Sequence, residues 1–195
     1  MVVSAVQQDA PPTLWLIRHA PVLAEKGRCY GVSDWPADAA ATAEAAEKLA
    51  ERLPHGLHVL VSPLLRCQQL ARMLQPLRSD LSFQNDTRLV ELNFGAWEGR
   101  AWSTIEQGEF DQWMADFAHA APGGNGESVA SLMARVGQIW SHWGSSRTDA
   151  AWITHAGVMR AALLLAKGVH LPTAASDWPA EDLPFGEVLK LQANR

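Results

Sequence analysis

Three short apolar runs, each followed by a segment typical of a helix, constrain the fold of this chain more than any other feature of its sequence. The runs are residues 13–17 (TLWLI), 58–61 (HVLV) and 150–154 (AAWIT). Their hydrophobicity is continuous rather than alternating, as expected of strands that are buried on both faces. Strands that alternate with helices form mainly parallel sheets, so the sequence predicts a three-layer α/β/α domain with helices on both faces of the sheet.

The segments between these runs show sequence patterns typical of helices and loops. Apolar residues recur three and four apart between Val129 and Trp143, which predicts an amphipathic helix. Ser62 and Pro63 are typical of an N-cap and a first helical residue. Residues 89–126 lack a period and are expected to form a lid or pocket wall. The expected helices are residues 39–53, 64–74, 129–143 and 158–167, and the last run, 186–192, is expected to be a strand.

Length and composition narrow the classes of protein to which the chain can belong. Its 195 residues suit one domain, residues 13–195, preceded by a disordered tail at 1–12. Acidic residues outnumber basic ones by 21 to 16, so no broad cationic face is expected for nucleic acid or a membrane. Two cysteines and the lack of a signal peptide or apolar span predict a cytoplasmic protein. A homodimer remains open.

Basic side chains stand where the three apolar runs end. Arg18 and His19 follow the first run, Arg66 lies near the start of the helix after the second, and His155 ends the third. In open α/β sheets such ends lie together at the edge where ligands bind, beside helix N-termini. We expect these four residues to surround one phosphate, because arginine binds its oxygens through two parallel hydrogen bonds and keeps its charge.

His19 is the candidate nucleophile and Glu91 the candidate proton donor. A neutral imidazole can attack phosphorus if its other ring nitrogen is held, while flanking cations stabilise the transferring group. The leaving alkoxide needs a general acid, and Glu91 in ELNFGAWEG is the first candidate, with Asp86, Glu98 and Glu127 as alternatives. The histidines show no spacing typical of a zinc site, so we expect neither a metal nor a cofactor.

Further residues are candidates for binding the rest of a small phosphorylated substrate. Arg28, Cys29 and Tyr30 lie in the loop GRCYGVSDWP, and Ala156 follows His155. Such a loop, turning at its glycines, would also place these three side chains there for packing alone. Both interpretations stay open for the loop residues.

Four motifs together resemble the histidine phosphatase superfamily, which includes cofactor-dependent phosphoglycerate mutases. They are LIRHA, SPLLRCQQLA, ELNFGAWEG and THAGVMR, in the order of the family, over about residues 14–186. The resemblance implies a phosphoglycerate mutase-like fold without a metal, and a phosphorylated His19. It also implies Glu91 as proton donor, and Arg18, Arg66 and His155 as the phosphate clamp. Ala20 departs from the family, which usually has glycine after the nucleophile.

Two loops are most similar to those of one group within the superfamily. GRCYGVSDWP and PGGNGES resemble the α-ribazole-5′-phosphate phosphatases, enzymes of cobalamin nucleotide-loop assembly. The chain is also shorter than the mutases it resembles, which favours a phosphatase. A phosphoglycerate mutase remains an alternative. So does a catalytically weak phosphate-binding or regulatory domain, for which Ala20 is the one hint.

Overall fold

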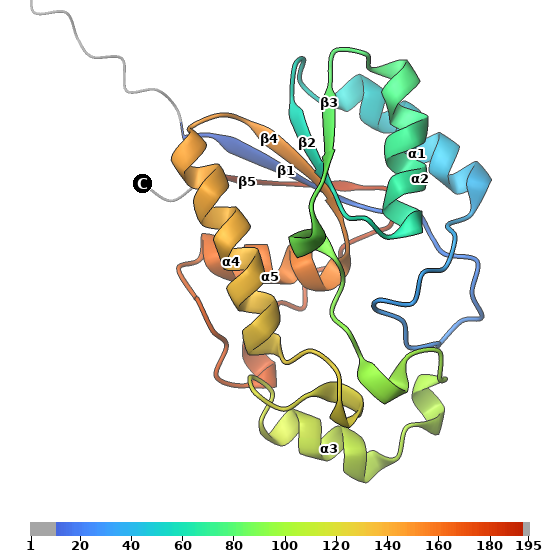
Figure 1. The fold of residues 1–195 in the computed structure, drawn as a ribbon, viewed down its shortest axis with the longest axis vertical. Helices are drawn as coiled ribbons and strands as arrows, with labels where there is room; N and C mark the ends of the chain where they lie inside the picture. The colour runs from blue at the N-terminus through green and yellow to red at the C-terminus, as the bar shows by residue number, and fades with distance from the viewer. Residues whose placement is uncertain (1–10, 193–195) are drawn as a thin grey trace, which may run out of the picture.

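A five-stranded sheet, with strand order β3-β2-β4-β1-β5, runs through residues 11–192, the part of the chain that this computed structural model describes (Figure 1). The strands β1 to β4 are parallel to one another, and β5 is antiparallel to β1. The predicted tail, residues 1–12, lies outside the described residues except for its last two. The strands are β1 (Thr13–Arg18), β2 (His58–Val61), β3 (Ser82–Asn85), β4 (Ala150–Thr154) and β5 (Val188–Gln192).

The continuous hydrophobicity of the central strands reflects burial on both faces of the sheet. In β1, Leu14 and Leu16 belong to one apolar cluster, whereas Trp15 and Ile17 belong to another. Successive side chains of a strand point to opposite faces, so each face needs its own apolar residues. The prediction of a three-layer α/β/α domain is confirmed.

Two helices cover each face of the sheet (Figure 1). α1 (Ala39–Arg52) and α2 (Leu65–Leu77) lie on one face, and α4 (Val129–Ser146) and α5 (Ala156–Ala166) on the other. Asp38 caps α1 by accepting a hydrogen bond from the Ala41 backbone N–H at 2.8 Å. The apolar stripe expected on α4 is buried, apart from a partly exposed Trp140. No helix within residues 11–192 is both long and apolar enough to cross a membrane.

The start of α2 differs from the prediction. Its first residue is Leu65 rather than Pro63, and no side chain within the motif caps it. Instead, Asp34 from a distant loop accepts a hydrogen bond from the Leu65 N–H at 2.6 Å. The Ser62 hydroxyl lies 2.8 Å from Nε2 of His155. The assignment of Ser62 as an N-cap is therefore wrong, because the helix begins only at Leu65 and Leu64 is its N-cap residue.

The segment between β3 and α4 is more regular than its sequence indicates. It contains α3 (Gln107–Ala115) and several short 3₁₀ turns, and it extends beyond one end of the strands (Figure 1). Trp97 stacks on Phe110, and the edge of Trp113 meets both rings. Contacts between aromatic rings therefore hold the segment together. The turns are η1 (Thr87–Leu89), η2 (Gly95–Trp97), η3 (Trp102–Thr104) and η4 (Pro122–Gly124), and η5 (Ala175–Asp177) follows α5.

Candidate active site

A cavity of about 410 Å³ lies where β1 ends and α5 begins. Its polar end contains Arg18, His19 and Glu91, with Arg28 and Arg160 also in its lining and Ala156 and Gly157 at the first turn of α5. A helix N-terminus presents free backbone N–H groups and favours anions. Aromatic rings line much of the remainder, and we call them the aromatic wall: Tyr30, Phe94, Trp102, Trp113, Phe117 and Trp178.

His19 has the hydrogen bonding and charge that a nucleophilic imidazole needs. Its Nδ1 lies 2.7 Å from the carbonyl oxygen of Ala20, so Nδ1 carries the proton and Nε2 keeps a lone pair. Burial, together with the charges of Arg66 and Arg18, lowers the pKa of His19 to about 3. The imidazole is therefore neutral at physiological pH. Ala20 supplies only its backbone carbonyl, so its methyl group does not remove this hydrogen bond.

Arg18 carries a hydrogen-bond donor that the protein leaves unused. One terminal nitrogen, Nη1, donates to the Leu183 carbonyl at 2.5 Å, and the guanidinium lies 3.7 Å from the centre of the Phe185 ring. The Nε–H is buried and has no hydrogen-bond partner within residues 11–192. A buried donor without a partner costs free energy. An anion bound beside His19 would satisfy it.

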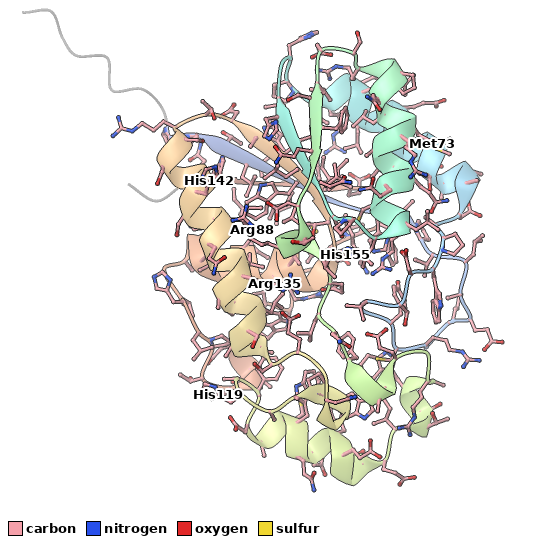
Figure 2. The ribbon with its side chains drawn as sticks, in the orientation of Figure 1. Met73, Arg88, His119, Arg135, His142 and His155 are labelled. Carbon is pink, nitrogen blue, oxygen red and sulfur yellow. The ribbon has the colours of Figure 1, made fainter. Side chains whose placement is uncertain are left out.

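Arg66 and His155 lie beside His19, but neither lines the cavity. The rings of His19 and His155 are 5.1 Å apart, and Figure 2 shows His155 near the centre of the molecule. Arg66 donates from Nε to Nδ1 of His155 at 3.2 Å. Since Nδ1 accepts, Nε2 of His155 carries the proton and donates to Ser62. The four predicted residues therefore converge around His19, and Arg66 and His155 are fully buried there, with other protein groups engaging part of their polar atoms.

Glu91 is the one carboxylate among the described residues that line the cavity. Its Oε2 accepts a hydrogen bond from the Gly157 N–H at 3.0 Å, at the first turn of α5. A methyl group on Gly157 would lie 2.3 Å from Oε1 of Glu91, so only glycine allows this approach. The close contact with Gly157 therefore fixes the position of the Glu91 carboxylate.

The three alternative carboxylates all have other partners. Asp86 pairs with Arg88 at 2.6 Å, and Glu127 pairs with Arg135 at 2.6 Å. The third, Glu98, accepts hydrogen bonds from backbone N–H groups of residues 31–33. Glu91 is therefore the carboxylate that the geometry favours as proton donor.

Arg135 supports the backbone of Glu91 and was not anticipated from the sequence. Its guanidinium donates to the carbonyls of Arg88 and Glu91 at 2.7 and 3.3 Å while it pairs with Glu127. Figure 2 shows Arg88 and Arg135 next to each other beside α4. The sequence feature that could have predicted this role is the place of Arg135 next to the buried apolar residues of α4.

The candidate substrate-binding residues divide into two groups. Arg28, Tyr30 and Ala156 line the cavity, and Arg28 is held there by the Gly99 carbonyl at 2.9 Å. Cys29 is fully buried in a cluster with Trp97 and Ile105, and burial raises the pKa of its thiol to about 12. The assignment of Cys29 to the substrate pocket is wrong, because alternate residues of the loop point to opposite sides.

A further residue of the site was outside the sequence-based expectations. Arg160 lines the cavity one helical turn after Ala156, and its Nε donates to the Pro179 carbonyl at 2.8 Å. Its position within THAGVMR was the available signal. Within residues 11–192, no three His, Cys, Asp or Glu side chains are grouped as a metal site would require.

Comparison with known proteins identifies the family. The profile of the histidine phosphatase superfamily (branch 1) matches residues 14–178 of the chain. The chain belongs to that superfamily. None of the functionally curated proteins compared with it matches at a significant level.

Solved structures agree with this assignment. TTHB049 from Thermus thermophilus is 29% identical, with 91% of this chain and 92% of that chain covered and a TM-score of 0.67. A mycobacterial glucosyl-3-phosphoglycerate phosphatase is 25% identical, with 92% and 89% covered and a TM-score of 0.75. A second mycobacterial protein, described as a hydrolase, is 26% identical, with 93% and 82% covered and a TM-score of 0.73. The chain is thus a histidine phosphatase in fold and in class of activity.

Proposed function

We propose that this histidine phosphatase hydrolyses a phosphomonoester through a phosphohistidine at His19, without a metal. The state of His19 carries the proposal. Its imidazole is neutral, its Nδ1 is held by the Ala20 carbonyl, and it lines the cavity beside the cation of Arg18. This arrangement leaves Nε2 free to attack phosphorus.

The first half-reaction transfers the phosphoryl group to the protein. Nε2 of His19 forms a bond to phosphorus as the bond between phosphorus and the ester oxygen breaks. Glu91, in its protonated form, gives its proton to the departing alkoxide. Arg18 and the N-terminus of α5 stabilise the negative charge on the phosphoryl oxygens.

The second half-reaction releases phosphate. The Glu91 carboxylate, now without its proton, takes one from a water molecule that attacks the phosphohistidine. The bond between phosphorus and Nε2 breaks, inorganic phosphate leaves, and His19 regains its lone pair. Glu91 ends the cycle protonated, as it began.

Arg66 completes the phosphate clamp in this proposal. A guanidinium has five N–H groups, of which the protein engages three: with His155, Ser33 and Gly31. The remaining two, together with the charge of Arg66, serve the phosphoryl group beside His19. His155, which Arg66 orients, packs its ring against that of His19 and so helps to fix the position of the nucleophile.

The aromatic wall supports α-ribazole 5′-phosphate as the substrate. This compound joins a phosphate to a flat heteroaromatic base through a ribose, and flat rings pack well against aromatic side chains. The cavity places its basic end at His19 and its rings around the remaining volume. Arg28 and Arg160, which also line it, favour an anionic leaving group such as a phosphoglycerate ester, and this is the second candidate.

A substrate panel with trapping of the intermediate tests the proposal. Wild-type protein, His19→Ala and the exposed control His142→Ala would be assayed, with and without a chelator, on α-ribazole 5′-phosphate, glucosyl-3-phosphoglycerate and 3-phosphoglycerate. We expect rapid quench of labelled substrate to trap an acid-labile phosphohistidine in wild type and His142→Ala only, and the chelator to change nothing.

Each outcome of this panel decides between the candidates. Full activity in His19→Ala, or no phosphate release by folded wild type, would overturn the phosphatase mechanism. A higher kcat/KM for glucosyl-3-phosphoglycerate than for α-ribazole 5′-phosphate would make glucosyl-3-phosphoglycerate the preferred substrate. Isomerisation of 3-phosphoglycerate faster than its hydrolysis would indicate a mutase, and tight phosphate binding without turnover would indicate a binding domain.

A further inference from the structure

The carboxylate of Glu98 is surrounded by donors from two separate segments. It accepts hydrogen bonds from the backbone N–H groups of Gly31 and Ser33 at 3.0 Å and of Val32 at 3.1 Å. The Ser33 hydroxyl and, at 2.9 Å, the Phe94 N–H complete the set. Glu98 therefore ties the loop at residues 31–33 to the segment that carries Phe94 of the aromatic wall.

The charge of Glu98 is needed for this arrangement. Partial burial opposes ionisation, but the hydrogen bonds from Gly31, Ser33 and Phe94 outweigh it, so the pKa of Glu98 lies below its usual value. An ionised carboxylate accepts on both oxygens and donates nothing, whereas an amide would turn an N–H group toward backbone N–H groups. A neutral isostere cannot reproduce the contacts.

The loop held by Glu98 leaves no space for adjustment at Gly31. A methyl group placed on Gly31 would lie 1.7 Å from the Leu92 carbonyl oxygen. The backbone of Gly31 is thus packed directly against the backbone of Leu92. The carbonyl groups of Gly31 and Ser33 belong to this same loop.

Those carbonyl groups hold the guanidinium of Arg66. Nη2 donates to the Gly31 carbonyl at 2.5 Å, and Nη1 donates to the Ser33 carbonyl at 2.8 Å. The third donor, Nε, reaches His155. The same three-residue loop therefore presents its three N–H groups to Glu98 and the C=O groups of Gly31 and Ser33 to Arg66.

We propose that Glu98 is a positioning residue for the phosphate-binding end of the site, acting through the loop at residues 31–33 on Arg66 and His155. This inference rests on the proposed phosphatase function. Glu98 does not line the cavity, so it acts by fixing the direction of the Arg66 guanidinium. A misdirected guanidinium weakens binding of the transferring phosphoryl group, because charge-assisted hydrogen bonds depend on geometry.

A double-mutant cycle separates this role from general support of the fold. Glu98→Gln, Arg66→Lys and the double variant would be compared with wild type in kcat/KM for the preferred phosphomonoester. We expect Glu98→Gln to lower kcat/KM about tenfold in wild type but less than about twofold in Arg66→Lys, since residues acting through one another are not additive. Equal losses in both backgrounds would overturn the proposal.

Binding of inorganic vanadate provides a second readout that does not need turnover. Calorimetry on the same four proteins should show the same coupling, with the loss of affinity on Glu98→Gln confined to proteins that retain Arg66. Ser33→Ala, which removes only the hydroxyl donor to Glu98, is the mild variant if Glu98→Gln does not fold. It should lower vanadate affinity about twofold to threefold in wild type and not in Arg66→Lys.

Asp80→Asn is the matched control. Its carboxylate also accepts from a backbone N–H, that of Gly56 at 2.9 Å, and from Arg78 at 2.7 Å, and Asp80 is outside the cavity lining. It should lose stability without loss of vanadate affinity. A similar loss of affinity in Asp80→Asn would show that the effect of Glu98 is one of general stability. Wild-type protein that binds vanadate with the predicted coupling but hydrolyses nothing would contradict the proposed function alone.

Discussion

His19 is kept neutral by burial, and this has a consequence for stability in acid. Its pKa in the folded protein is about 3, against an ordinary value of 6.5. Between these values the unfolded chain binds a proton that the folded protein does not, so stability falls as pH falls below about 6.5. His155 acts in the same direction, because burial lowers its pKa also.

Replacing His19 should therefore make the protein less sensitive to acid. We expect His19→Gln to reduce the slope of unfolding free energy against pH by up to about 1.4 kcal/mol per pH unit between pH 4.5 and 6.5. Chemical denaturation across that range measures it, with the exposed His142→Gln as control. An unchanged slope would show that His19 titrates near its ordinary pKa.

Gly157 sets the position of Glu91. Since a methyl group there would lie 2.3 Å from Oε1 of Glu91, Gly157→Ala should displace the carboxylate and lower kcat by about 10² or more. Gly137→Ala in α4 is the control, because its added methyl group meets nothing within 4 Å. Both variants should unfold near the wild-type temperature. Full turnover in Gly157→Ala would show that the contact with Gly157 does not set the working position of Glu91.

At the scale of single elements, the strength of the sequence pattern follows the amount of buried surface. β2 and β4 were predicted with their observed bounds, and α4 with its observed start and an end three residues early, because each buries a face or stripe of apolar side chains. β3 was missed, since this edge strand, SFQN, is mostly exposed and shows no apolar pattern. α3 was missed because it has no buried residue of its own.

The contribution of α4 is a prediction at this scale. Leu132 is fully buried against the sheet, so Leu132→Ala should lower the free energy of unfolding by about 2–5 kcal/mol. The exposed Gln138 of the same helix is the control, and Gln138→Ala should change stability by less than about 0.5 kcal/mol. Urea denaturation measures both. A small loss at Leu132 would indicate that α4 is not part of the cooperative unit.

At the scale of the whole molecule, the aromatic wall joins segments that are distant in the sequence. Tyr30 comes from the loop after β1, Phe94 to Phe117 from the long segment before α4, and Trp178 from the turn after α5. Its chemistry is therefore a property of the fold. Specificity for the leaving group should depend on it more than on the residues around His19.

Trp102 is the most suitable position to test that dependence. It is 37% exposed and its ring meets those of Phe94 and Trp97, so Trp102→Ala should lower the free energy of unfolding by about 1–2 kcal/mol and leave the protein folded. We expect kcat/KM to fall about tenfold for α-ribazole 5′-phosphate and to stay within about twofold for 3-phosphoglycerate. Met114→Ala, an equally exposed position outside the cavity lining, is the control. Equal losses on both substrates would show that the wall does not select the leaving group.

The sequence by itself determined the layered fold, the candidate nucleophile and the residues that gather around it, because each depends on local signals: continuous apolar runs, a helical period and basic side chains at strand ends. Only the tertiary structure decided which of these residues face the cavity. It turned Cys29 into the core, bound Arg66 to the carbonyls of Gly31 and Ser33, and bonded Glu98, an alternative to Glu91, to the loop at residues 31–33. The reason is physical: the direction of a side chain at the end of a strand is set by partners from other segments of the chain, and no local pattern records them.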